Sequence, residues 1–205
     1  DKAFIMIDMN HTLWQNCEWS NLRMENDSTL TGYKLVKGWG PERHVYFTAV
    51  FSKKLKNLRI MQDKKPVIYN TSRFRSCYEA WGKNLMACIS FAAEEGEEVI
   101  VKTSVSAVST AGATLNLQEL NGMTFDALRE KGVGLWEKEL SKYQIEAKPE
   151  VKEAFYTAAY RAALHPFVFQ DADGQFRGLD KNVEKAEGFT NYTVFSLWDT
   201  YQIGR

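Results

Sequence analysis

Short apolar or alternating runs recur along the first half of the chain, separated by clusters of turn-forming residues. The runs are Ala3–Met9, Trp19–Met24, Tyr33–Val36, His44–Ser52, Leu58–Met61, Leu85–Ala92 and Val99–Val105. Alternation within a run indicates a strand with one buried face and one solvated face. Several short strands at this spacing are typical of an antiparallel β-sandwich. We therefore predict a sandwich for the first half of the chain.

The pattern changes to a helical period after about Gly112. Thr124 is a plausible N-cap for a helix that runs to about Lys142, and Asp126 is favourably placed in its first turn. Gly132 and Gly134 fall inside this helix, where each glycine costs about 1 kcal/mol relative to alanine. We therefore expect the helix to be broken or closely packed at that point.

A second helix is predicted to begin near Pro149, because proline suits the first helical position. Its apolar residues recur at helical spacing and cover most of its circumference: Val151, Ala154, Phe155, Tyr156, Ala158, Ala159, Tyr160 and Ala162. Such a helix is normally buried in a larger helical assembly. The residues after it are predicted to form hairpins, Phe167–Gln170 with Phe176–Leu179 around Asp173-Gly174, and later Tyr192–Trp198. We therefore expect the partners of this helix to be encoded beyond Arg205.

Composition and charge narrow the functional classes. The chain has 205 residues, of which 44% are hydrophobic and 25% charged, as in ordinary globular proteins. The formal net charge is zero, which argues against a nucleic-acid partner, because phosphates attract a basic excess. No apolar run reaches the roughly 20 residues of a membrane-spanning helix. The start at Asp1, without a methionine, is typical of a processed chain.

The sequence gives only a weak signal for a metal site or for a disulfide. Asp171-Ala172-Asp173-Gly174 is similar to the opening of a calcium loop, but Gln175 occupies the next ligand position and no closing glutamate follows. A hairpin turn is favoured there. The histidines do not pair at zinc-ligand spacing, and we interpret the three cysteines as free thiols or as one disulfide and a thiol. No metal ligand and no catalytic residue is predicted in this chain. The motifs of nucleotide-binding proteins and serine hydrolases are not found.

The most informative pair is Trp198-Asp199. An ionised aspartate accepts several hydrogen bonds, which suits the vicinal hydroxyls of a pyranose, and an indole offers an apolar wall or an N–H donor. The same pair also fits a core aromatic residue beside a capping aspartate.

Motifs that recur in order along the chain change this balance, because together they resemble glycoside hydrolase family 92. They are Gly32-Tyr33, Gly38-Trp39, His44–Phe47, Phe51-Ser52, Phe155–Ala162, His165-Pro166, Asp173–Asp180 and Phe195–Tyr201. This family comprises calcium-dependent α-mannosidases that are abundant in gut Bacteroidetes. The resemblance implies an α+β fragment with an N-terminal β-sandwich (1–112), a helical linker (113–148) and the incomplete start of an (α/α)6 toroid (149–205).

The same resemblance implies the function. The parent protein is expected to be a secreted, periplasmic or outer-membrane-surface glycosidase: an exo-acting, inverting α-mannosidase, of α-1,2 type, that hydrolyses terminal mannose from glycans. Trp198 and Asp199 are expected to bind the mannose. The general acid, the general base and the calcium ligands are expected downstream, so this chain alone is expected to be inactive and to need the remainder of the catalytic domain as its partner.

Two departures keep other functions open. The earliest strands of the family's sandwich are not found, and after Tyr201 the chain has Gln202–Arg205 where the family continues with an arginine and a His-Pro pair. One alternative is a non-catalytic carbohydrate-binding or interaction module. Another is a related toroid enzyme such as a phosphorylase, which phosphate-dependent turnover would identify.

Overall fold

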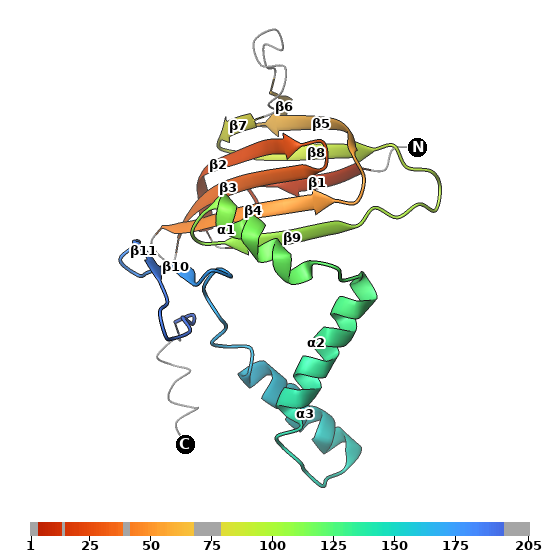
Figure 1. The fold of residues 1–205 in the computed structure, drawn as a ribbon, viewed down its shortest axis with the longest axis vertical. Helices are drawn as coiled ribbons and strands as arrows, with labels where there is room; N and C mark the ends of the chain where they lie inside the picture. Colours follow the sequence, from red (N-terminus) through yellow and green to blue (C-terminus); the bar gives the residue numbers. More distant parts are fainter. Residues whose placement is uncertain (1–3, 14, 39–41, 68–78, 195–205) are drawn as a thin grey trace. The chain divides into compact units, whose positions relative to one another are not determined.

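The computed structural model describes residues 4–13, 15–38, 42–67 and 79–194. The chain divides into two compact units (Figure 1). The first, the sandwich unit, comprises Asp1–Glu119 together with Asp171–Lys185; the second, the helical unit, comprises Leu120–Gln170 and Ala186–Arg205. The predicted domain boundaries at residues 112 and 148 stay predictions.

Two antiparallel sheets form the sandwich unit, as the sequence predicts (Figure 1). The five-stranded sheet has the order β7-β2-β3-β4-β9, with β7 (Glu79–Gly82), β2 (Gln15–Asn26), β3 (Thr29–Gly38), β4 (Arg43–Phe51) and β9 (Val101–Ser106). The four-stranded sheet has the order β1-β8-β5-β6, with β1 (Phe4–Asp8), β8 (Leu85–Phe91), β5 (Leu55–Gln62) and β6 (Lys65–Pro66).

The core lies between the two sheets. Strand β8 shows why: alternate residues from Leu85 to Phe91 are buried, and the residues between them are partly exposed. Both sheets contribute to one buried cluster: Met9, Leu22, Leu30, Ala49, Phe51, Leu58, Ile60, Ala80, Leu85, Ala87, Ile89 and Phe91. Gly32 makes room for Phe47, because a Cβ there would lie 2.3 Å from Cε1 of the Phe47 ring. Backbone and ring can therefore approach closely only at a glycine.

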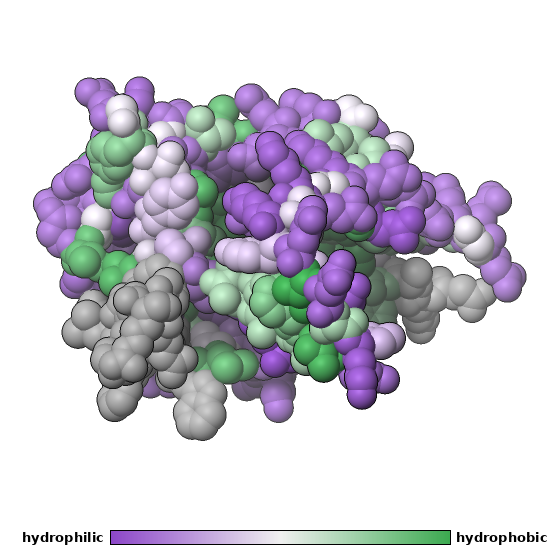
Figure 2. All heavy atoms as spheres, turned by 90° about the horizontal axis from the view of Figure 1, so that it is seen from below, coloured by the Kyte–Doolittle hydropathy of each residue, from purple (hydrophilic) through white to green (hydrophobic). Residues whose placement is uncertain are grey.

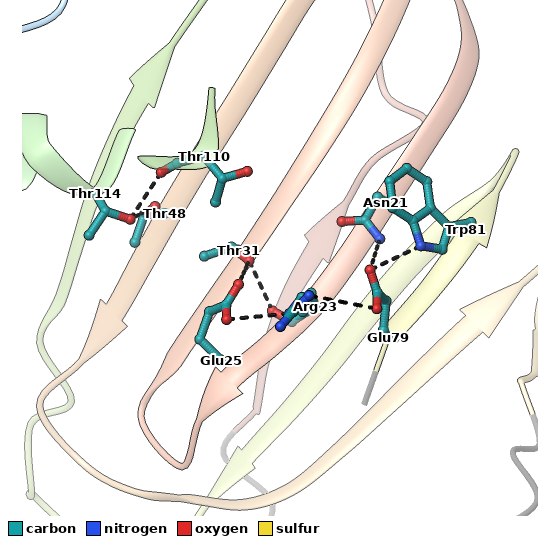
Figure 3. A network of polar contacts seen from close by, with 9 residues as sticks. All are labelled: Asn21, Arg23, Glu25, Thr31, Thr48, Glu79, Trp81, Thr110 and Thr114. Atoms are coloured by element: carbon teal, nitrogen blue, oxygen red, sulfur yellow. Dashed lines mark hydrogen bonds and ion pairs between the residues drawn. The ribbon is translucent and has the colours of Figure 1, made fainter. Parts of the chain in front are cut away.

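A short helix, α1 (Thr110–Asn116), packs on the outer face of the five-stranded sheet at its β4–β9 end. Ser109 caps it by accepting from the Gly112 amide. The Thr48 and Thr114 hydroxyls are 2.9 Å apart (Figure 3), and Ser104 donates to the Ala113 carbonyl. Sequence analysis placed the helical onset only after about Gly112, so this helix begins earlier than predicted. A 3₁₀-helix, η1 (Leu117–Leu120), follows.

The helical unit contains α2 (Phe125–Leu140) and α3 (Pro149–Ala162), close to their predicted positions. Thr124 is the N-cap of α2, as predicted, and its hydroxyl accepts from Ala127 N at 3.2 Å. The expected break or close packing at Gly132 and Gly134 is wrong. The helix is continuous there, and a Cβ at either glycine would meet nothing within 4 Å.

Aromatic contacts join the two helices. The ring centroids of Trp136 and Tyr160 are 4.4 Å apart, and Tyr156 donates to the Tyr143 carbonyl at 2.9 Å. Neither helix has a buried residue. Hydrophobic side chains at the molecular surface beside hydrophilic ones are visible in Figure 2. The described chain therefore leaves most of the apolar surface of α3 uncovered, as expected from its sequence.

The hairpin predicted around Asp173-Gly174 needs a correction. The tight turn itself is confirmed, because Gly174 N donates to Asp171 O at 2.8 Å and Asp171 N to Gln175 O at 2.7 Å. The predicted strand pairing is wrong, since β10 (Gln175–Arg177) pairs with β11 (Val183–Lys185). Residue Val168 instead forms a bridge with Tyr192. The pairing of β10 with β11 is set by a second turn at residues 178–182. That turn contains no Asp-Gly pair, so the sequence pattern did not reveal it.

Candidate functional site

The two predicted substrate-binding residues, Trp198 and Asp199, lie outside the described residues. The described chain approaches them through Asn191–Thr193, which runs antiparallel to Phe167–Gln170. Phe169 N donates to Asn191 O and Thr193 N to Phe167 O, both at 2.9 Å. The Asn191 side chain adds a bond to Phe169 O at 2.7 Å. The segment before the predicted site is therefore held by backbone pairing within the helical unit.

Asp171 forms a buried polar site in the sandwich unit and is 5% exposed. One carboxylate oxygen accepts from the Ser106 hydroxyl at 2.6 Å, and the other accepts from the Asn116 amide at 2.8 Å. Asn116 also accepts from Ala172 N at 2.8 Å. A Cβ at Gly112 would lie 2.1 Å from Asp171 Oδ2, so only glycine leaves room for the carboxylate. We call Ser106, Gly112, Asn116 and Asp171 the Asp171 anchor.

Arg177 attaches the same segment to the sandwich unit a second time. Its guanidinium donates to the carbonyls of Ala107 at 2.8 Å and Val108 at 3.3 Å, and to that of Lys181 at 2.8 Å. The Ala107 and Val108 carbonyls lie just after β9, and their hydrogen-bonding capacity must be met when they are covered. The hairpin Asp171–Lys185 is thus attached to the rest of the sandwich unit by Asp171 and by Arg177 on β10.

Ion pairs at the edge of this hairpin lower the pKa of one carboxyl group, that of Glu42. Glu42 lies 3.2 Å from Lys181 Nζ through one oxygen and 3.2 Å from Lys37 Nζ through the other. The hydrogen bonds from Lys181 and Lys37 lower the pKa of Glu42 below its ordinary value. The group is exposed, so these pairs contribute little to stability.

His44 and Tyr33 lie next to this edge on the outer face of the five-stranded sheet. The Tyr33 hydroxyl is 3.1 Å from His44 Nδ1, and the Tyr33 ring centroid lies 4.7 Å from that of Tyr46. Burial lowers the pKa of His44, and the positive charge of Arg177 adds to this effect. Burial also raises the pKa of Tyr33. Both groups are therefore held in their neutral forms, which suits structural packing.

The described polar groups do not form a catalytic centre. Both oxygens of the buried Asp171 are occupied by neutral donors within the fold, so this carboxylate is not free to transfer a proton to a substrate. Asp173 is likewise engaged, by Gln175. Within the described ranges, no group of three or more His, Cys, Asp or Glu residues could hold a metal ion. Cys17 and Cys88 are free thiols, whereas Cys77 lies outside the described residues.

Another polar cluster, centred on Glu79, lies at the β7–β2 end of the five-stranded sheet (Figure 3). The Trp81 indole N–H and the Asn21 amide both donate to Glu79 Oε1, at 3.0 Å and 3.1 Å. Arg23 lies 4.0 Å from the other Glu79 oxygen and 3.3 Å from Glu25. Trp81 remains 55% exposed, and Trp19 is 45% exposed.

Sequence reasoning did not identify either cluster. The Asp171 anchor joins residues 55 to 65 positions apart along the chain, and the Asp-Gly turn at 171–174 signals a bend without naming a partner. Strand β7 was not predicted at all, because Glu79–Gly82 is short, so the position of Trp81 beside Asn21 had no signal in the pattern. A search for alternation over four residues is the only sequence signal that could have found it.

Two family models match the chain. The model of the glycosyl hydrolase family 92 N-terminal domain matches residues 1–106 of the 205, and that of the family 92 catalytic domain matches residues 112–203. The resemblance drawn from the ordered motifs is therefore confirmed. No curated protein matches the chain.

Solved structures agree with the family models. The family GH92 α-mannosidase BT3965 from Bacteroides thetaiotaomicron is 79% identical, with a TM-score of 0.93, over 98% of this chain and 27% of that chain. Its complex with mannoimidazole gives the same identity and TM-score, over 98% of this chain and 26% of that one. The family GH92 inverting mannosidase BT2199 from the same species, strain VPI-5482, is 19% identical. Its TM-score is 0.81, and the match covers 98% of this chain and 26% of that chain. It shows the fold alone.

The chain spans about a quarter of the length of these solved mannosidases. None of the helices described here is long and apolar enough to span a membrane.

Proposed function

Because this chain belongs to glycosyl hydrolase family 92, we propose that it works as part of an α-mannosidase that releases terminal mannose from glycans. The observation that carries the proposal is the 79% identity, with a TM-score of 0.93 over 98% of the chain, to a family GH92 α-mannosidase. At this identity the substrate-binding residues of the matched region are expected to serve the same sugar.

The proposed reaction is exo-acting and inverting, with α-1,2 linkages as substrate. In such a reaction one carboxylic acid protonates the leaving oxygen, and a carboxylate about 6.5–9.5 Å away activates water on the opposite face of the sugar. We assign neither role to a residue of this chain. Trp198 and Asp199 are proposed to hold the terminal mannose, with the indole against the ring and the carboxylate accepting from its hydroxyls.

Calcium is the metal that the resemblance implies. The described residues do not fit it: Asp171 and Asp173 already accept hydrogen bonds from Ser106, Asn116 and Gln175, and no acidic cluster is found among them. Its ligands are therefore expected elsewhere in the protein. A location outside the cytoplasm, in the periplasm or at the outer surface, is part of the proposal because the glycans to be trimmed lie there.

The site assignment is tested by Asp199→Ala in the complete enzyme. Removing a charged acceptor from buried sugar hydroxyls is expected to cost about 3 kcal/mol of transition-state stabilisation, which is on the order of a hundredfold in kcat/KM. The measurement is mannose release from an α-1,2-mannobioside. Asp126→Ala, an exposed aspartate on α2, is the matched control. A kcat/KM within about twofold of the unmodified enzyme would remove Asp199 from the site.

The activity itself is tested by assaying the 205-residue chain alone and joined to the rest of the enzyme. Mannose release only by the complete enzyme, lost on chelation of calcium, is the expected result. Mannose release by the chain alone would contradict the placement of the acid and base outside it. Phosphate-dependent release would instead identify a phosphorylase.

A further inference from the structure

The outer face of the five-stranded sheet has two unlike ends. At the β4–β9 end helix α1 covers it through Thr48 and Ser104. At the β7–β2 end the side chains of Trp19 and Trp81 are about half exposed, at 45% and 55%. Both belong to one face, because Trp81 pairs with Asn21 and Trp19 is two residues before Asn21 on the same strand.

The two indoles are spaced for an extended ligand. Trp19 and Trp81 are diagonal neighbours across β2 and β7, a relation that separates residues by about 7–8 Å. The next strand continues the aromatic surface, since Tyr33 pairs with Asn21 and its ring lies tilted against that of Tyr46, with 4.7 Å between the centroids. A row of ring faces therefore crosses the strands. We call Trp19, Asn21, Tyr33, Glu79 and Trp81 the tryptophan face.

The orientation of Trp81 is fixed by a polar contact. Its indole N–H donates to Glu79 Oε1 at 3.0 Å, and Asn21 donates to the same oxygen at 3.1 Å (Figure 3). This bond meets the polar requirement of the indole while leaving the ring more than half exposed. An exposed ring held in one orientation loses little conformational entropy when a ligand stacks on it.

The cations around the tryptophan face are each paired with a carboxylate. Arg23 lies between Glu25 and Glu79, at 3.3 Å and 4.0 Å, and Lys83 lies 3.3 Å from Glu18. Such a surface has no positive excess to attract a phosphate or an acidic peptide. Its exposed indoles and its amide and carboxylate groups instead complement a neutral ligand with apolar ring faces and many hydroxyls.

We propose that the tryptophan face binds a mannose oligosaccharide, as a second glycan site apart from the predicted Trp198–Asp199 pair. The identity of the sugar rests on the proposed function, whereas the site itself rests on the contacts described above. Trp81 and Trp19 stack on successive pyranose rings, and Glu79 accepts hydrogen bonds from their hydroxyls, while the buried Asn21 holds Glu79 in place.

The competing occupant is protein: another part of the complete enzyme covering the same face. Hydroxyl-radical labelling of the complete enzyme without glycan distinguishes the two. If the tryptophan face binds sugar, Trp81 is labelled and mannotriose protects it. Protection of Trp81 before any sugar is added overturns the proposal.

The direct test is the binding of mannotriose to the 205-residue chain. Tryptophan fluorescence and NMR of the indole N–H groups measure this binding. Trp81→Ala and Trp19→Ala are each expected to weaken binding about tenfold, and Trp81→Phe, which keeps a ring, by less than about threefold. Trp136→Phe, in the helical unit, is the matched control and leaves binding unchanged. Because β7 is a short strand, each variant is first compared with the parent by circular dichroism.

Each outcome decides one question. Absence of mannotriose binding, equal binding of cellotriose, or full binding by Trp81→Ala overturns the second site, whatever the complete enzyme hydrolyses. Binding that depends on Trp81 supports it even if the complete enzyme releases no mannose, in which case the proposed function alone fails.

Discussion

The sandwich unit and the helical unit have similar shares of apolar residues and use them in opposite ways. In the sandwich, Leu22, Leu30, Leu85 and Ile89 are 0% exposed and share one core. In the helical unit, Phe125 is 75% exposed, and neither α2 nor α3 has a buried residue. The sandwich therefore contains its own source of stability, whereas the described helices contribute no buried residue of their own. Apolar residues at regular spacing predict an element, and burial decides what that element contributes.

Truncation of a core residue should separate the two units most clearly. Leu22→Ala is expected to lower the free energy of unfolding by about 2–5 kcal/mol, because it leaves a cavity between the sheets. The matched control is Val151→Ala on α3. Val151 is 54% exposed, so its truncation should lower the free energy of unfolding by less than about 0.5 kcal/mol. Urea unfolding of the chain measures both. Equal losses would refute the division into a cored and an uncored unit.

The Asp171 anchor should matter next, because Asp171 is where the chain returns to the sandwich unit from the helical unit, which ends at Gln170. Asp171→Ala leaves the buried Ser106 hydroxyl without its acceptor and removes one of the two hydrogen bonds that the Asn116 amide donates, and should cost about 1–3 kcal/mol. Gly112→Ala should have a similar effect, since its Cβ would lie 2.1 Å from Asp171 Oδ2. In the double variant the two losses should not add. Urea unfolding and proteolysis of the hairpin report the result, and additive losses would separate the two residues.

The glycines of α2 should give a smaller change of opposite sign. Gly132→Ala and Gly134→Ala remove flexible positions from a continuous helix and introduce a Cβ with nothing within 4 Å. Each should stabilise the helix by up to about 1 kcal/mol, seen as higher helicity by circular dichroism. Gly112→Ala in α1 is the opposite control, because that glycine is closely packed. Loss of helicity on substitution would show that these glycines are packed after all.

A pH effect at His44 should be the smallest of the four. Tyr33, Tyr46, Glu42, Arg177 and Lys181 surround it, and burial lowers its pKa below 6.5. The unfolded chain therefore binds this proton more readily, so stability is full above about pH 6.5 and falls over the pH interval below that value. His44→Gln should flatten the stability curve in that interval. An unchanged slope in His44→Gln would assign the effect to another group.

Sequence patterns predicted the elements of the fold well where each one was long and periodic. The main strands and helices α2 and α3 lie close to their predicted positions, and Thr124 and Pro149 act as expected at the helix starts. Strand β7 and helix α1 were missed because four and seven residues carry too little period. The Gly132–Gly134 prediction was wrong because intrinsic propensity was outweighed within a helix that has strong helix formers on both sides.

The candidate site was harder to predict than the fold. The ordered motifs gave the family, and the resemblance assigned Trp198 and Asp199, which lie outside the described residues. The Asp171 anchor depends on a contact 65 positions apart, and the tryptophan face depends on which strand lies beside β2. Long-range pairing of this kind leaves no local trace in a single sequence.

The docked hairpin Asp171–Lys185 also affects how the protein can be divided. The family models divide the chain between residues 106 and 112, yet this hairpin, which lies in the catalytic-domain match, completes the surface around Ser106 and Val108. A recombinant piece ending near residue 112 would expose two carbonyls that Arg177 now binds, and would leave the Ser106 hydroxyl without its acceptor. Exchange of N-terminal domains between relatives therefore has to carry the matching hairpin along with the sandwich.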